Sequence, residues 1–279
     1  MYRFRYVYAS NGRSAFLLDL IHEPERATLR LLWSHSGSNT VARSAAGYGA
    51  AQRGGDIEKA SLALASFSET TARSQLPGLE FEINYVLQPG SERFGPAWVP
   101  RLFARVPDFH SRYGRLTHAF VLGVTLRDLP LAYSWYSVND LAEARWLLVS
   151  ALEFSGTDLR IELTAVRMSS TWLGALVVRY QGVTHRFTGL SSAWRVNIGD
   201  AGRSVDDKRR FTARVSGGNL DLTLEAEAPL QDFVLLEDHG VTQIQTALFG
   251  DCEVRIRTSA AATPVAHRAT RTCLLELKS

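Results

Sequence analysis

The sequence has little cysteine, no long hydrophobic run and almost no excess of charge. Two cysteines in 279 residues do not form a disulfide framework and favour a reducing compartment. No apolar run approaches the roughly 20 residues that a transmembrane helix needs. The first residues, Met1–Tyr8, lack the apolar core of a signal peptide. These absences predict a cytoplasmic protein without a transmembrane segment.

The charge balance argues against a nucleic-acid partner. The chain has 31 basic and 28 acidic residues, which gives a net charge of +3. The one basic cluster, Lys208-Arg209-Arg210, follows Asp206-Asp207 and is typical of a solvated hairpin tip rather than a binding patch. We therefore expect no nucleic-acid partner.

Motifs that would assign a cofactor are also missing. Gly47-Tyr48-Gly49 lacks the third glycine of a phosphate-binding loop, and no G-x-S-x-G nucleophile elbow occurs. The seven histidines are dispersed, without the close spacing of a zinc site. The sequence predicts no cofactor and no metal.

Period-2 alternation of apolar and polar residues dominates the chain. Leu220, Leu222 and Leu224 alternate with polar residues, for example, and polar turns such as Gly217-Gly218-Asn219 separate the runs. Many short strands joined by polar turns indicate an all-β sandwich or barrel. Two stretches differ: residues 37–56 are rich in Gly, Ala and Ser and predict a long loop, and Ile57–Arg73 fits either a helix or a strand.

Residues 145–154 are apolar on both faces, which is typical of a strand covered on both sides. We place this strand where two lobes meet and expect Trp146 and Leu148 to be buried there. The chain then breaks near residues 138–143, which predicts domains at residues 1–139 and 140–279.

Chemically interesting residues concentrate in residues 118–153. Glu153 shares a face with Leu147, Val149 and Ala151 if the strand continues, and an apolar environment would keep its carboxyl protonated for general acid catalysis. If the strand has ended by then, Glu153 is solvated. His118 precedes an apolar strand and is either a proton donor facing the interior or a strand-edge residue.

Four aromatic residues, Tyr133, Trp135, Tyr136 and Trp146, lie close to the expected lobe junction. Such rings either stack on an apolar ligand or form ordinary core. The candidate catalytic residues are therefore Glu153, His118 and Tyr133, and the candidate substrate-binding residues are Trp135, Tyr136 and Trp146.

The two cysteines lie in the arms of one expected hairpin, residues 249–257 and 269–277. A register centred on the loop between them places Cys252 opposite Cys273. We expect two buried, reduced thiols on one face.

The order of segments in residues 115–277 resembles the tocopherol cyclase and carotenoid hydratase group, whose lipocalin-like lobes also occur in some natural-product Diels–Alderases. The resemblance covers a little over half of the chain. The segments that carry it are, in order, Phe120–Leu126, Ala132-Tyr133-Ser134-Trp135, the strand beginning Arg145-Trp146, the hairpin at 176–183, the strand Leu220–Glu225, and the paired segments 249–256 and 269–277. The group tends to have Asn-Trp-Gly where this chain has Ser134-Trp135-Tyr136, so only the tryptophan matches.

The resemblance implies two lipocalin-like antiparallel barrel or sandwich lobes packed together around a hydrophobic cavity, with no cofactor. It implies a cyclase (including pericyclic types such as a Diels–Alderase), a hydratase or an isomerase of secondary metabolism, acting on a polyene, prenyl or polyketide-like molecule. The alternative is a non-catalytic carrier of a hydrophobic molecule. A buried ionisable group distinguishes the enzyme from the carrier, because protonating an alkene requires an acid.

Overall fold

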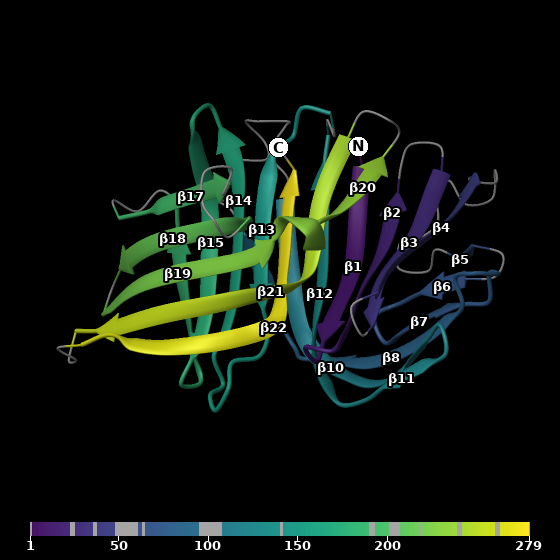
Figure 1. Cartoon of the computed structure of the whole chain (residues 1–279), viewed down its shortest axis with the longest axis horizontal. Helices are drawn as coiled ribbons and strands as arrows, with labels where there is room; N and C mark the ends of the chain where they lie inside the picture. Colours follow the sequence, from purple (N-terminus) through teal and green to yellow (C-terminus); the bar gives the residue numbers. More distant parts are fainter. Residues whose placement is uncertain are drawn as a thin grey trace. The chain divides into compact units, whose positions relative to one another are not determined.

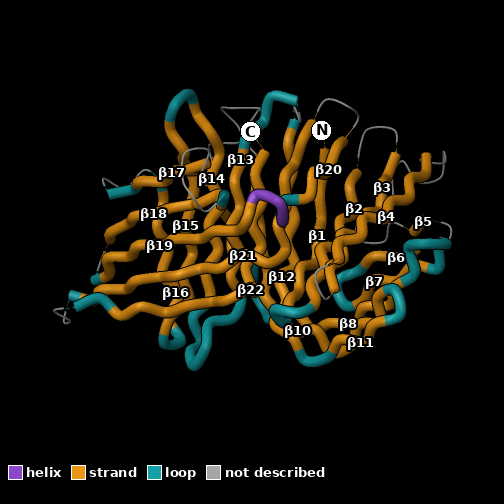
Figure 2. Tube along the Cα trace, viewed as in Figure 1, coloured by secondary structure: helices purple, strands orange, loops and turns teal. Residues whose placement is uncertain are grey.

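The computed structural model of the chain is built almost entirely of β-strands (Figure 2). It describes residues 2–22, 26–35, 38–47, 61–62, 65–94, 108–139, 142–189, 193–200, 207–217, 219–238, 242–259 and 263–278. Within these ranges the one helical element is a 3-10 turn, η3 (Leu230–Asp232). No helix in the described part of the chain has the length and apolarity to cross a membrane. The expected all-β, two-lobed lipocalin-like class is confirmed.

The chain divides into two compact units. Unit 1 comprises Met1–Arg93 and Phe109–Val138, and unit 2 comprises Phe94–Asp108 and Asn139–Ser279. Two curled antiparallel sheets account for the strands, the first formed by β1 to β12 and the second by β13 to β22 (Figure 1).

The first sheet follows the order β4-β3-β2-β1-β12-β10-β8-β7-β6-β5, and β9 and β11 pair with β10. Its strands are β1 (Tyr2–Ser10), β2 (Ser14–His22), β3 (Arg26–His35), β4 (Ser38–Gly47), β5 (Ser61–Leu62), β6 (Ala65–Phe67), β7 (Thr71–Ser74), β8 (Phe81–Leu87), β9 (Glu92–Phe94), β10 (Asp108–Val121), β11 (Val124–Leu126) and β12 (Leu129–Val138).

The second sheet follows the order β16-β15-β14-β13-β22-β21-β19-β18-β17, and β20 pairs with β21. Its strands are β13 (Trp146–Ala151), β14 (Arg160–Met168), β15 (Thr171–Tyr180), β16 (Val183–Thr188), β17 (Arg195–Asp200), β18 (Lys208–Gly217), β19 (Leu220–Pro229), β20 (Val234–Asp238), β21 (Thr242–Thr258) and β22 (Val265–Lys278).

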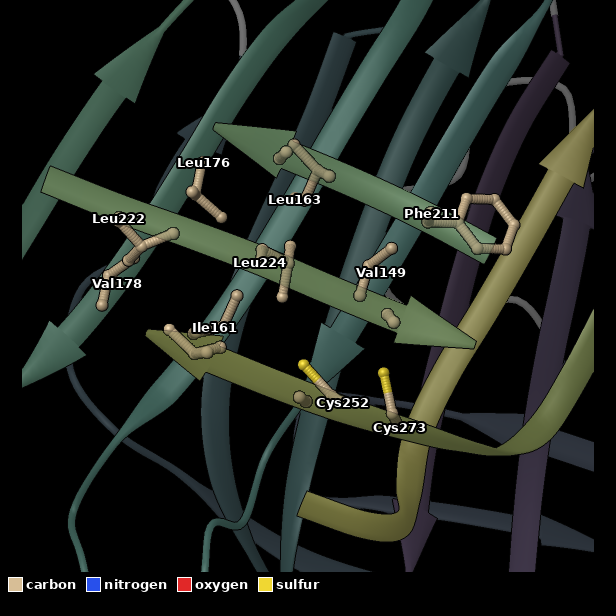
Figure 3. Close-up of a cluster of buried hydrophobic side chains, with 14 of the residues drawn as sticks. Val149, Ile161, Leu163, Leu176, Val178, Phe211, Leu222, Leu224, Cys252 and Cys273 are labelled. Atoms are coloured by element: carbon tan, nitrogen blue, oxygen red, sulfur yellow. The ribbon is translucent and has the colours of Figure 1, made fainter. Parts of the chain in front are cut away.

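The second sheet curls until strands near its two ends approach each other. Strand β15 contacts β17, and the Trp194 indole Nε1 donates a hydrogen bond to the Trp172 carbonyl at 2.9 Å. The inner face therefore encloses one apolar core, to which Val149, Leu163 and Leu224 contribute from three different strands (Figure 3). Along β19 this face alternates with a polar one, as the sequence predicts.

Each sheet thus has a core face and an opposite face, here called the reverse face. In unit 1 the core face carries Leu18, Leu20 and Tyr133, among others. Strand β13 is buried on both faces: Leu147 and Val149 belong to the core of unit 2, and Trp146 and Leu148 on the reverse face are also buried. The two-sided burial expected for this strand is confirmed.

The tight turn between β15 and β16 depends on backbone with positive φ. Gln181 and Gly182 have φ of 52° and 75°, as a two-residue hairpin turn of type I′ requires. The Asp158 carboxylate accepts hydrogen bonds from both of their backbone N–H groups, at 3.0 and 2.7 Å. These bonds, that of Gly182 first, lower the pKa of Asp158.

The two cysteines lie in the core of unit 2, where both side chains point to the same side (Figure 3). The expectation of free, buried thiols on one face is confirmed, but the expected register is wrong. Cys273 pairs with Gly250 and Cys252 with Ala269, because β22 begins at Val265, four residues before the expected arm, and the pairing runs from there without a shift to Cys252.

Two expectations for the first half of the chain change. Residues 38–47 form strand β4 rather than a loop. The remainder of the expected loop, residues 37 and 48–56, lies outside the described residues. In the range Ile57–Arg73 the described residues, 61–62 and 65–73, form strands and the turns between them. The strand alternative therefore holds for these residues.

Candidate functional site

Glu153 lies outside the strand that was expected to bury it. Strand β13 ends at Ala151, so the alternation does not reach Glu153, and its side chain is exposed. Its backbone carbonyl accepts a hydrogen bond from the Thr272 hydroxyl at 3.2 Å. Of the two alternatives for Glu153, the structure shows the second: the strand has ended and the side chain is solvated, so the desolvation argument for its acidity does not apply.

His118 lies within β10, opposite Asn84, just after a register shift that separates it from Leu116. Its neighbours Ala119 and Val121 belong to the core of unit 1. Since side chains alternate along a strand, the half-buried His118 lies on the reverse face. The structure does not direct it toward the interior of unit 1.

Tyr133 and Trp135 lie together on the core face of the first sheet. The Tyr133 ring is 5.9 Å from that of Trp135 and 6.1 Å from that of Tyr85. The His110 imidazole stacks on Trp135, with centroids 5.2 Å apart and planes within 6°. We call these four residues the inner aromatic wall.

The inner aromatic wall is partly open to solvent. Tyr85 and Tyr133 are buried, whereas Trp135 and His110 are only half-buried. The Tyr85 hydroxyl donates to the Ser68 carbonyl. The wall therefore offers an aromatic surface on which a flat apolar group can stack.

Tyr136 lies on the other side of the first sheet from Tyr133 and Trp135. Its ring is 4.6 Å from Phe109 and 6.5 Å from Tyr6, both buried. Alternation along β12 therefore separates residues that the sequence analysis grouped in one aromatic cluster.

The same reverse face carries a buried ion pair between β2 and β3. Arg30 lies directly opposite Asp19, and its Nε donates to the carboxylate at 2.9 Å. Burial raises the pKa of Asp19, while the charge and hydrogen bonds of Arg30 act in the opposite direction. Further along, the hydroxyls of Ser111 and Ser134 are hydrogen-bonded at 2.6 Å.

Trp146 contributes to a polar cluster on the reverse face of the second sheet. Its indole Nε1 donates to Glu276 Oε1 at 2.8 Å. The Lys278 ammonium lies 5.6 Å from the Trp146 ring centroid and donates to the Ala144 carbonyl at 2.8 Å. Trp146, Glu276 and Lys278 are 0%, 4% and 2% exposed, so all three are removed from water.

Strand β14 adds a second buried carboxyl to this face. Glu162 is 1% exposed and lies directly opposite Ser150 of β13. Acidic side chains are almost never fully buried unless they are paired, so two of them on one sheet face are unusual. We call the following residues the buried polar face: Trp146, Ser150, Glu162, Thr164, Thr246, Glu276 and Lys278.

Glu162 and Glu276 were not predicted as site residues, because each alternates with core residues along its strand. Glu276 lies between Leu275 and Leu277, a pattern that predicts a solvated face. The sequence feature that could have indicated their burial is strand β13, which is apolar on both faces. Its neighbours β14 and β22 extend the same reverse face, so their outward polar residues are buried with Trp146 and Leu148.

Surface grooves in unit 2 have a different character. One groove of about 470 Å³ is lined by charged residues that pair with one another, including Arg268 with Glu253 at 2.7 Å and Arg210 with Glu227 at 2.7 Å. Such a surface does not suit an apolar ligand. Among the described residues, no group of three His, Cys, Asp or Glu side chains is placed to hold a metal ion.

Comparisons with known proteins identify the fold. No protein-family model and no curated protein sequence matches the chain. Solved structures do: kievitone hydratase from Nectria haematococca has a TM-score of 0.52 at 12% identity, covering 99% of this chain and 88% of the other. CghA has a TM-score of 0.56 at 10% identity, and CghA with Sch210972 a TM-score of 0.55 at 11% identity, with the same coverages.

At these identities the likeness shows the fold alone. The chain therefore has the two-lobed lipocalin-like fold of the tocopherol cyclase and carotenoid hydratase group, and the resemblance found in the sequence is confirmed at that level.

Proposed function

We propose that this protein is a hydratase- or cyclase-type enzyme acting on a hydrophobic small molecule, and that the buried polar face supplies its acid. The observation that carries the proposal is the pair of buried carboxyls on one sheet face: Glu276, which accepts a hydrogen bond from the Trp146 indole, and Glu162, which lies opposite Ser150. A carrier can bind its ligand with apolar groups alone, whereas protonating an alkene requires an acid shielded from water.

The roles of the residues follow from their contacts. The Trp146 indole holds one oxygen of Glu276, which fixes the orientation of the carboxyl. Lys278 is anchored on the Ala144 carbonyl and places positive charge near the ring. A fixed donor in a water-poor site needs little reorganisation during proton transfer.

The fold neighbours support the reaction class. One is named as a hydratase, and another was solved with Sch210972. On this proposal the enzyme protonates an alkene, and water or an internal nucleophile completes the reaction.

The test compares carboxyl variants on a panel of prenylated phenols and polyenes. We expect both Glu276→Gln and Glu162→Gln to fold normally. At least one of the two variants should lose turnover by about 10² or more, the scale of a lost general acid, and that variant identifies the acid. Glu153→Gln is the matched control, since it changes an exposed carboxyl of the same unit. Full activity in both buried variants would contradict the proposal.

The inner aromatic wall favours a second candidate, a carrier that stacks an apolar ligand on Trp135. In that case Trp135→Ala weakens binding of retinol by about tenfold, an aromatic contact being worth on the order of 1 kcal/mol. The carboxyl variants of the buried polar face then bind normally, and no substrate is converted. Fluorescence titration with retinol measures the affinity.

A further inference from the structure

Three hydroxyl side chains of the buried polar face have no hydrogen-bond partner within the described part of the chain. They are Ser150 Oγ, Thr164 Oγ1 and Thr246 Oγ1. Their residues are 0%, 3% and 0% exposed. Folded proteins satisfy the large majority of buried polar side-chain atoms with protein groups or ordered water. Three orphaned hydroxyls on one sheet face therefore point to a ligand.

The strand register places each hydroxyl next to a buried carboxyl. Thr246 of β21 lies directly opposite Glu276 of β22, and Ser150 of β13 lies directly opposite Glu162 of β14. Directly opposed side chains in an antiparallel pair have Cβ atoms about 4.5–5.5 Å apart. Thr164 is two residues from Glu162 on the same strand, so it shares that face.

The surroundings select the charge of the ligand. Glu162 and Glu276 disfavour an anion, and Lys278 disfavours a cation. An apolar ligand would leave all three hydroxyls unsatisfied. A neutral ligand with oxygen atoms fits, because each hydroxyl can both donate to it and accept from it.

We infer that these hydroxyls bind neutral oxygen at two positions on this face, one at Ser150 and Thr164 on adjacent strands and one at Thr246: ordered water in the free protein, exchanged for a hydroxyl or carbonyl oxygen of the substrate. The binding of water stands by itself, and the binding of a substrate oxygen rests on the proposed function. The substrate is then an apolar skeleton that carries at least one hydroxyl or carbonyl group, rather than a pure hydrocarbon.

The stability of isosteric variants tests the water-binding part. Valine replaces threonine with almost the same shape but without the hydroxyl. If Thr164 and Thr246 bind water, Thr164→Val and Thr246→Val lower Tm, by about 2–4 °C each for a protein of this size. Thr223→Val, on the polar outer side of β19, is the matched control for the intrinsic effect of the exchange.

A Tm equal to or above that of the control variant overturns the inference, because removing an unsatisfied hydroxyl stabilises a protein. Should the variants not fold, a high-resolution crystal structure of the unmodified protein decides. Water within hydrogen-bond distance of at least two of the three hydroxyls supports the site, and a dry face overturns it.

A matched pair of probes tests the substrate part. We expect Thr164→Val to weaken binding of geranylgeraniol about tenfold, the scale of one lost hydrogen bond, and to leave binding of the corresponding C20 hydrocarbon unchanged. Equal weakening of both probes, or no binding of the alcohol, overturns this part. Failure of the proposed function has another signature: no turnover of any substrate, with the stability differences and bound water still present.

Discussion

The hydrogen bond from the Trp146 indole to Glu276 joins two residues 130 positions apart in the sequence. Both are buried, so the carboxyl oxygen has exchanged water for an N–H group fixed by the strand. A buried acceptor that loses its donor is costly.

Trp146→Phe tests this contact, since phenylalanine keeps an aromatic ring but has no donor. We expect the free energy of unfolding to fall by about 2–4 kcal/mol, from the lost hydrogen bond and the smaller ring. Urea denaturation measures it. Trp172→Phe is the control, because Trp172 is only half-buried and takes part through its backbone carbonyl. Equal losses in the two variants would contradict a special contribution of the Trp146 donor.

At the scale of elements, the hairpin of β21 and β22 shows what a sequence can and cannot predict. Alternation correctly placed Cys252 and Cys273 on the core face. It did not predict the register, because the start of β22 at Val265, four residues before the expected arm, has no clear signal in the sequence. Glu153 shows the same limit in the prediction of strand ends: the alternation of the sequence continues past Ala151, but strand β13 ends there.

The thiols of this hairpin should be unreactive in the native protein. Burial, and then the hydrogen bond with the Cys273 thiol, raise the pKa of Cys252 well above its ordinary value. Since the thiolate is the reactive form, we expect DTNB to find no accessible thiol in the folded protein near pH 8 and two after unfolding without reductant. Finding none after unfolding would reveal a disulfide and contradict the structure.

The opposite face of the same hairpin should make stability depend on pH. Hydrogen bonds from Arg255 and Arg268 lower the pKa of Glu253 below its ordinary value of 4.5. The folded protein therefore binds this proton less readily than the unfolded chain does. The contribution to stability is present above pH 4.5 and is lost as the pH falls through the lowered pKa.

We expect Glu253→Gln to be less stable than the unmodified protein near neutral pH, and the difference to shrink as the pH falls from about 5 to about 3. Urea denaturation across this range measures it. A difference that stays constant with pH would show that Glu253 contributes through packing rather than through its charge.

At the scale of the whole molecule, the all-β class and the two-lobed fold could be predicted because they depend on a pattern repeated in nearly every strand. The candidate acid could not be predicted from the sequence, because its burial depends on which polar sheet face is covered in the folded protein. Glu276 and Glu225 follow the same local alternation, yet Glu276 is buried and Glu225 is exposed. That difference lies in tertiary structure. The division into domains 1–139 and 140–279 stays a prediction, as does the cytoplasmic location.

The central claim is that the intact chain transfers a proton to a hydrophobic substrate, and solvent isotope labelling tests it most directly. The protein is incubated in D2O with the panel of prenylated phenols and polyenes, and products are analysed by mass spectrometry. We predict conversion of at least one substrate, with one deuterium bound to carbon in each product molecule and no such label with Glu276→Gln and Glu162→Gln combined. Ligands that bind and are recovered unchanged, or products without carbon-bound deuterium, would contradict the claim.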